Sequence, residues 1–153
     1  MVRLSELPAA EAEFLRDTDC PTFDDEPWVS GPPLAERRVA MVSSAGLNIR
    51  GDRPFLSGSA GFRVIPDDVD PGDILMSHVS VNFDRTGFQQ DLNVILPLDR
   101  LHELAADGVI GSVATAHYSF MGATDPLKME ANARKLAGVM KDDGVDTVIL
   151  LPV

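Results

Sequence analysis

The segment at residues 145–153, VDTVILLPV, constrains the fold more than any other part of the chain. It is apolar at consecutive positions from Val148 onward, so a strand there would need cover on both of its faces. Strands of this kind are typical of parallel sheets, which carry helices on both sides. We therefore expect residues 145–153 to form a central parallel strand.

The remaining apolar runs alternate between strand and helix patterns. Residues 39–42 are continuously apolar and lead into Ser43 and Ser44, as in a buried strand that delivers its carboxyl end to a crevice. Further predicted strands lie at 62–66, 74–78, just after residue 93 and within 109–119, and predicted helices lie at 97–106 and 126–143. This pattern predicts an α/β fold with a mainly parallel sheet and flanking helices, Rossmann-like and three-layered, although the G-x-G-x-x-G fingerprint is absent.

Residues 1–36 differ from the rest and are expected to form an irregular N-terminal arm on a domain of residues 37–153. A short helix is predicted near residues 4–16, followed by a stretch rich in Pro, Gly and Asp. The apolar side chains expected to face inward are Leu4, Leu7, Phe14 and Leu15. We expect the arm to wrap the domain, with Trp28 anchored in a surface groove. Cys20 has acidic neighbours that raise a thiol pKa, so it is interpreted as a bystander.

The charge of the chain limits its partners. Twenty-four acidic and thirteen basic side chains give a formal charge of −11, which disfavours nucleic acid and anionic membrane surfaces. No signal pattern and no apolar run of membrane-spanning length occurs, and Cys20 is the single cysteine. We therefore expect a cytoplasmic protein without an internal disulfide, which acts on a small molecule and could form a homo-oligomer.

The polar stretch at residues 77–101, SHVSVNFDRTGFQQDLNVILPLDRL, is the best site candidate, and its Gly87 argues against a helix or a long strand there. His78 and His117 fall at predicted strand ends and are the candidate catalytic, acid/base groups. The candidate substrate-binding residues are Ser43, Ser44, Asp84, Asp91, Asn93, Ser119, Met121 and Gly122. We hypothesise that His78, Asp91 and His117 surround one pocket.

Alternatives remain open for several of these residues. Each histidine could simply hydrogen-bond a loop, Asp91 and Asn93 could fix a turn, and Met121 could pack in the core. The spacing of the histidines fits no standard metal motif, so no metal is expected. A metal-dependent hydrolase or lyase that uses both histidines with Asp84 or Asp91 stays as an alternative function.

Six stretches, RRVAMVSSAGL, GDRPF, FRVIP, residues 77–101, GVIGSVATAHYSFMG and KDDGVDTVILLPV, resemble the glycine/sarcosine/betaine reductase selenoprotein B family, which includes the selenocysteine subunit of D-proline reductase. The most specific parts of this resemblance are His78, residues 91–93, residues 97–100 and residues 117–122. The resemblance implies an oxidoreductase subunit that reductively cleaves a carbon–nitrogen bond in glycine, betaine, sarcosine or a D-proline-like substrate. A selenolate or thiolate would attack the α-carbon, disulfide-type chemistry would restore the enzyme, and partner subunits would carry a pyruvoyl group.

The resemblance also implies a selenocysteine or cysteine in the loop just after residues 145–153. The sequence stops at Val153, so no cofactor or redox residue of this kind lies within it, and we expect these 153 residues alone to be inactive. One hypothesis is that the domain is truncated at a UGA selenocysteine codon. The alternative is a non-catalytic binding subunit of the same fold.

Overall fold

The computed structural model describes residues 3–18, 22, 28–81 and 84–153. Its larger sheet has the order β3-β6-β1-β5, and β7 also pairs with β1. The strands of this sheet are β1 (Arg38–Ser43), β3 (Arg63–Pro66), β5 (Ser112–Val113), β6 (Ala116–Ser119) and β7 (Thr147–Leu151). Strands β5, β6 and β7 run parallel to β1, whereas β3 is antiparallel to β6. The predicted α/β fold with a mainly parallel sheet is confirmed, but its Rossmann-like detail is not.

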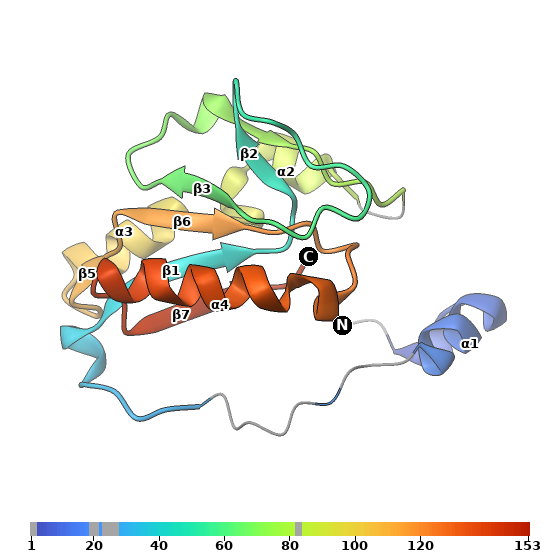
Figure 1. Cartoon of the computed structure of the whole chain (residues 1–153), viewed down its shortest axis with the longest axis horizontal. Coiled ribbons are helices and arrows are strands. Elements are labelled where there is room, and N and C mark those ends of the chain that lie inside the picture. Colours follow the sequence, from blue (N-terminus) through green and yellow to red (C-terminus); the bar gives the residue numbers. More distant parts are fainter. Residues whose placement is uncertain (1–2, 19–21, 23–27, 82–83) are drawn as a thin grey trace.

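Helices flank this sheet on both faces (Figure 1). The helical elements are η1 (Leu4–Glu6), α1 (Ala9–Asp17), η2 (Leu34–Glu36), η3 (Pro71–Asp73), α2 (Thr86–Gln90), η4 (Leu92–Val94), α3 (Leu98–Ala106) and α4 (Pro126–Asp142). Leu98 and Leu101 of α3 belong to the core cluster that contains Met41 of β1. Leu136 and Met140 of α4 belong to a second cluster, on the other side. None of these helices is both long and apolar enough to cross a membrane.

The longest helix, α4, begins and ends where the sequence predicts. The Asp125 carboxylate accepts a hydrogen bond from the backbone N–H of Leu127 at 3.0 Å, and Pro126 occupies the first helical position. Gly144, with φ of +72°, follows the helix in the left-handed conformation that glycine adopts freely. These local signals set both ends of α4, and Leu136 and Met140 pack it against Tyr118 of β6.

The prediction that residues 145–153 form a central strand is wrong. In the described structure β7 pairs with β1 alone, in parallel register from Val39 opposite Thr147 to Ser43 opposite Leu151. Figure 1 shows β1 between β6 and β7, so β7 lies at the edge. Its Leu150 side chain is 70% exposed. A run of apolar residues therefore indicated a parallel strand correctly, but it carries no information on how many neighbours the strand has.

Three local predictions also need correction. Residues 92–94 form the 3-10 turn η4 rather than a strand, and Gly87 lies inside the short helix α2. Residues 47–49, where no strand is predicted, form β2 (Leu47–Ile49), which pairs antiparallel with β4 (Ile74–Met76) in a second, two-stranded sheet. A three-residue strand is too short to show an alternating pattern.

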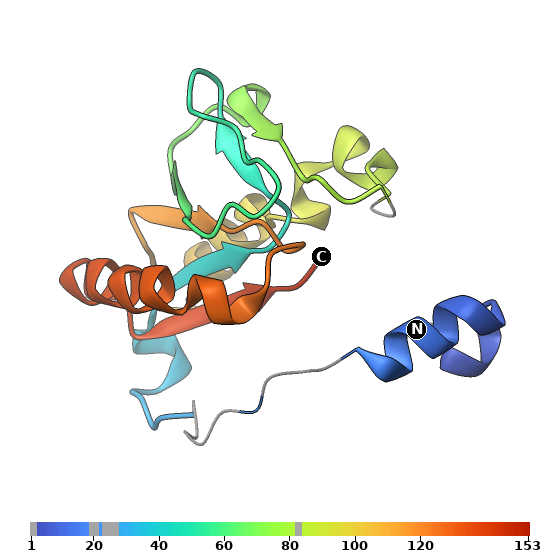
Figure 2. The ribbon, with the colours of Figure 1, turned by 45° about the vertical axis from the view of Figure 1, so that its right-hand side comes forward.

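The N-terminal arm does not pack as expected. In Figures 1 and 2, α1 stands away from the sheet instead of lying against it. Phe14 is 70% exposed and Trp28 is 90% exposed, so neither the inward-facing pattern nor the Trp28 anchor is found. Trp28 only borders a hollow beside β7, which Val148 and Leu150 also line. Cys20 lies outside the described residues.

Candidate functional site

Three strands of the sheet meet at one edge of the domain, where β1, β6 and β7 end. The backbone N–H of Ser44 donates to the Leu151 carbonyl at 3.1 Å, and the N–H of Gly122 donates to the Ser44 carbonyl at 2.8 Å. The Ser44 hydroxyl oxygen accepts a hydrogen bond from the N–H of Val153 at 2.8 Å. Ser44 is thus the residue at which these three strand ends are joined, and we call this region the carboxyl edge.

Ser43 and Ser119 support the carboxyl edge from inside. Both residues are fully buried. The Ser119 hydroxyl donates to the Ser43 carbonyl at 3.0 Å and accepts from the N–H of Leu47 at 2.9 Å, while the Ser43 hydroxyl accepts from the N–H of Ala45 at 3.2 Å. Because both hydroxyls already make hydrogen bonds to backbone groups, their role is to hold the backbone in place. The half-buried Ser44 is the serine nearer to solvent.

A glycine brings His78 and Met121 to the same edge. Gly46 has φ of +67°, and a Cβ atom built on it would lie 3.0 Å from Cε of Met121 and 3.1 Å from Cα of His78. A Cβ built on Gly122 would lie 2.8 Å from the Ser44 carbonyl oxygen. The structure therefore brings His78, Met121, Gly122 and the serines together at the carboxyl edge.

His78 is buried and holds its proton at a defined atom. Its Nδ1 accepts a hydrogen bond from the N–H of Ser80 at 3.1 Å, which assigns the proton of the neutral ring to Nε2. Burial, and next the nearby Arg85 cation, lower the pKa of His78. The guanidinium of Arg85 also donates to the His78 carbonyl at 2.6 Å, and this hydrogen bond joins His78 to a residue seven positions further along the chain. The result is a neutral imidazole with a donor at Nε2.

His117 is bonded to protein groups on both ring nitrogens. It is fully buried, and its Nδ1 accepts from the N–H of Met41 at 3.1 Å. The ring proton therefore lies on Nε2, which donates to Oδ1 of Asp67 at 3.1 Å. Burial lowers the pKa of His117, against the opposing effect of the hydrogen bond and charge of Asp67. These contacts tie β6 to β1 and to the turn after β3.

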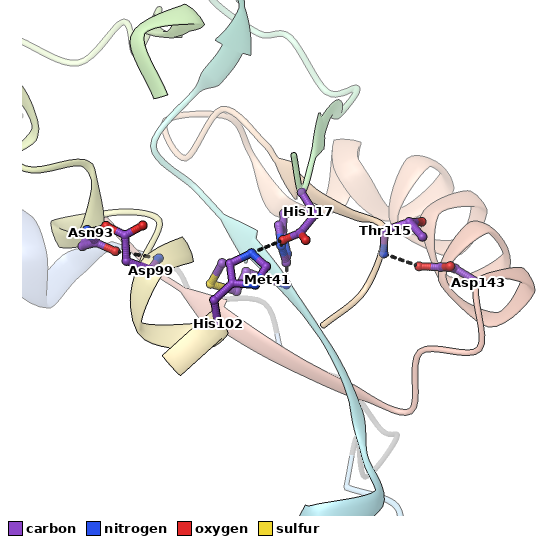
Figure 3. A network of polar contacts seen from close by, with 8 residues as sticks. Met41, Asn93, Asp99, His102, Thr115, His117 and Asp143 are labelled. Atoms are coloured by element: carbon purple, nitrogen blue, oxygen red, sulfur yellow. Dashed lines mark hydrogen bonds and ion pairs between the residues drawn. The ribbon is translucent and has the colours of Figure 1, made fainter. Parts of the chain in front are cut away.

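Asp67 was not among the predicted site residues, and the exposed His102 also approaches it. Nε2 of His102 lies 2.9 Å from the same Oδ1 of Asp67 that His117 approaches, so this carboxylate links α3 to β6 (Figure 3). The N–H of Asp67 donates to the carbonyl of Thr115 at 3.0 Å, at the amino end of β6 and away from the carboxyl edge. Only the antiparallel pairing of β3 with β6 brings these residues together, and the sequence carries no signal for it.

The metal-site alternative gains no support from the described residues. No group of three or more His, Cys, Asp and Glu side chains among them has the arrangement of a metal site. Nε2 of His117 carries a proton and so cannot act as a ligand, and Asp84 uses its Oδ1 to accept the N–H of Thr86 at 2.9 Å.

Asp91 and Asn93 fix a turn, which is the alternative that the sequence left open. Oδ1 of Asp91 accepts from the backbone and the side-chain amide of Asn93, both at 2.9 Å. The same Asn93 side chain also donates to Asp99 at 2.9 Å and accepts from the N–H of Asp99 at 3.1 Å. Hydrogen bonds from the Asn93 backbone and side chain lower the pKa of Asp91, and those from Thr86 lower the pKa of Asp84.

The turn that Asp91 and Asn93 fix lies beside a hollow of its own. Asp91, Asn93 and Asp99 border a hollow of about 180 Å³, and neither His78 nor His117 lines it. The hypothesis that one pocket holds His78, Asp91 and His117 stays a prediction. His78 lies at the carboxyl edge, whereas His117 is directed toward Asp67.

The fold and the carboxyl edge define an α/β domain whose polar groups gather at the ends of parallel strands. Residues 10–152 match the family described as glycine/sarcosine/betaine reductase selenoprotein B. The chain belongs to this family. No solved structure matches it significantly.

Curated relatives give the same family. D-proline reductase subunit gamma of Acetoanaerobium sticklandii is 34% identical over 120 residues, which are 76% of this chain and 49% of the relative. Glycine reductase complex component B subunit gamma of Peptoclostridium litorale is 26% identical over 144 residues, 90% of this chain and 33% of the relative. The protein of the same name from Symbiobacterium thermophilum is 29% identical over 140 residues, 85% of this chain and 32% of the relative. The chain thus spans between a third and a half of these relatives.

Proposed function

We propose that this chain provides the carboxyl-edge site of a selenoprotein B-type reductase subunit, which takes part in reductive cleavage of a carbon–nitrogen bond. The substrate class is glycine, betaine, sarcosine or a D-proline-like amine. The observation that carries the proposal is the meeting of His78, Met121 and Gly122 with Ser44 at one edge of a sheet in a member of this family.

Ser44 has the role of fixing the backbone at the carboxyl edge, where the proposed reaction takes place. Its hydroxyl accepts the N–H of Val153 at 2.8 Å, directly where β7 leaves the sheet. A selenocysteine or cysteine that followed this strand, as in the family resemblance, would supply the nucleophile beside Ser44 and Gly122. Gly122 is required because any side chain there would meet the Ser44 carbonyl.

His78 has the role of hydrogen-bond donor to the leaving nitrogen. Breaking the carbon–nitrogen bond leaves an electron pair on nitrogen, and a fixed N–H donor directed at it stabilises the transition state without transferring its own proton. The neutral ring of His78 carries its proton on Nε2, because Nδ1 accepts the N–H of Ser80. His117, held between Met41 and Asp67, acts as a positioning residue that keeps β6 and β1 in register.

The hollow bordered by Asp91, Asn93 and Asp99 is a second candidate binding place for the amine group of the substrate. Asp91 keeps a lowered pKa and so a negative charge, and Asn93 holds it beside Asp99. An ammonium group is complementary to these carboxylates. Partner subunits also belong to the proposal, because the relatives are named as subunits of reductases. A cytoplasmic location is proposed with them.

The test uses the protein as expressed from its gene, assembled with the other subunits of the complex. Amine release or ring opening is followed under a dithiol reductant with glycine, betaine, sarcosine and D-proline. We expect turnover of one of the four, and a loss of at least tenfold in kcat for His78→Gln, since removing one positioned donor to a developing charge costs roughly 10²–10³-fold. His102→Gln, which alters a half-exposed histidine at Asp67 away from the carboxyl edge, is the matched histidine control and should lose much less of its rate than His78→Gln. An assembled complex that turns over none of the four substrates would rule the proposal out.

A non-catalytic binding subunit is the second candidate. Cys20, in the arm, is the single thiol of the sequence, and its surroundings are acidic. In that case the complex would turn over substrate equally well with wild-type protein and with His78→Gln, while substrate binding to this subunit would still respond to Asp91→Asn.

A further inference from the structure

Residues 3–18 form a segment that is structurally separate from the domain. In the described structure the hydrogen bonds of this segment join groups within it, such as the Thr18 hydroxyl to the Phe14 carbonyl at 2.7 Å and the Arg3 N–H to the Glu6 carboxylate at 3.0 Å. Figures 1 and 2, seen from two directions, show α1 apart from the sheet. The sheet therefore gives α1 no surface on which to pack.

A helix in this position needs a surface from elsewhere. Helix α1 has nine residues, and its first turn lacks a side-chain cap because Pro8 precedes it. Isolated helices shorter than about 12–15 residues are marginal in water, and most helices gain their stability from packing an apolar face. The apolar groups available on α1 are Phe14, which is 70% exposed, and Leu15, which is 49% exposed. Covering these two side chains would stabilise the helix.

Charge determines which surface can cover them. Residues 3–18 hold four acidic and two basic side chains, a formal charge of −2, and residues 37–153 hold fifteen acidic and eleven basic ones, a formal charge of −4. Within α1, Glu11 and Glu13 lie close in sequence to the exposed Phe14 and Leu15. A negatively charged segment is repelled by its own domain and by a second copy of the chain, whereas a basic surface attracts it.

We propose that residues 3–18 dock into an apolar groove rimmed by Lys and Arg side chains on a different subunit of the reductase complex. Phe14 and Leu15 enter the groove, and Glu11 and Glu13 pair with its basic rim. This inference rests on the proposed function, because it takes its partner from the same complex. Helix α1 becomes fully stable only on binding, so the association includes an ordering step.

The test measures binding of the full chain to the other purified subunits at 50 mM and 300 mM salt. Phe14→Ser with Leu15→Ser removes the apolar contact, and Glu11→Lys with Glu13→Lys reverses the charge. Each double variant should weaken binding at least tenfold, and the wild-type affinity should fall with salt while that of the charge-reversed variant should not. Matched controls on the domain are Leu127→Ser, since Leu127 is 59% exposed, and Asp52→Lys with Asp107→Lys. The controls should stay within twofold of wild type.

Hydrogen exchange of the full chain gives an independent readout. Amides of residues 9–17 should exchange rapidly in the free chain and become protected in the complex. Protection already present in the free chain would mean that α1 packs on its own domain, which overturns the inference.

The remaining outcomes separate this inference from the proposed function. If the wild-type chain binds a subunit and both arm variants bind it equally well, the docking role of the arm is wrong and the subunit proposal stands. If the wild-type chain binds no subunit of the complex, the subunit proposal fails and the inference fails with it. If the arm variants change only self-association in sedimentation, the occupant is a second copy of the chain and the inference is overturned.

Discussion

The backbone N–H of Met41 donates to Nδ1 of His117 over 3.1 Å, and this bond connects two fully buried residues of neighbouring strands. It makes the histidine a structural acceptor in the middle of the sheet. Replacement by leucine would leave the buried N–H of Met41 without a partner.

His117→Leu should therefore lower the free energy of unfolding by about 1–3 kcal/mol, the usual cost of an unsatisfied buried polar group. His117→Asn should cost less, because its amide oxygen can accept from Met41. Urea unfolding at pH 7 measures both values. Equal losses for the two variants would mean that the hydrogen bond from Met41 does not stabilise the fold.

The stability of the protein should also depend on pH through His117. Burial lowers its pKa in the folded state below the value of about 6.5 that histidine has in an unfolded chain. The unfolded chain therefore binds the proton more readily, so this contribution is complete above pH 6.5 and is lost as the pH falls below it. Unfolding free energies of wild type and His117→Asn, measured from pH 7.5 to pH 5, should converge at the acidic end. His78, whose pKa burial also lowers, should give the same trend in wild type and variant and so cancels in the difference.

Gly46→Ala should destabilise the carboxyl edge more than the equivalent change at Gly58. Both glycines have positive φ, +67° and +74°, so both alanines carry backbone strain of roughly 1–2 kcal/mol. A Cβ atom at Gly46 would also press against Met121 and His78, whereas Gly58 has open space around it. The excess loss at Gly46, measured by urea unfolding, reports the close approach of these segments. A difference of zero between the two variants would contradict the contact.

Asn93→Asp should weaken the turn between α2 and α3 in a charge-dependent way. The Asn93 amide lies 2.9 Å from both Asp91 and Asp99, and an aspartate there would place three carboxylates together. We expect a lower thermal midpoint at pH 7, with part of the loss restored by 0.5 M salt. A second substitution, Asp99→Asn, should also restore stability. A midpoint of Asn93→Asp that does not respond to salt would show that repulsion is not the cause.

Local signals in the sequence predicted the elements that depend on a few neighbouring residues. Asp125, Pro126 and Gly144 mark both ends of α4, and the run into Ser43 and Ser44 marks a strand that ends at a polar edge. The turn-fixing role of Asp91 with Asn93 was also readable, because an aspartate reaches the N–H two residues on.

Features that depend on pairing over long distances could not be predicted. Asp67 meets His117 only because β3 lies antiparallel to β6, and fifty residues separate the two. The position of β7 at the sheet edge depends on the number of its neighbours, which no residue pattern encodes. The exposure of Phe14 is a third case, because an amphipathic pattern shows that a surface is needed but not which molecule supplies it.

The pairing of β1 with β7 also has a consequence for synthesis of the protein. Val39 lies opposite Thr147, a separation of 108 residues, so β1 leaves the ribosome long before its β7 neighbour exists. At a translation rate of roughly 5–20 residues per second, that delay is about 5–20 s. During this interval one side of an apolar strand has unpaired backbone groups, which is the condition under which nascent chains aggregate or are bound by chaperones. Translation speed, rather than the intrinsic rate of strand pairing, thus limits how early this sheet can form.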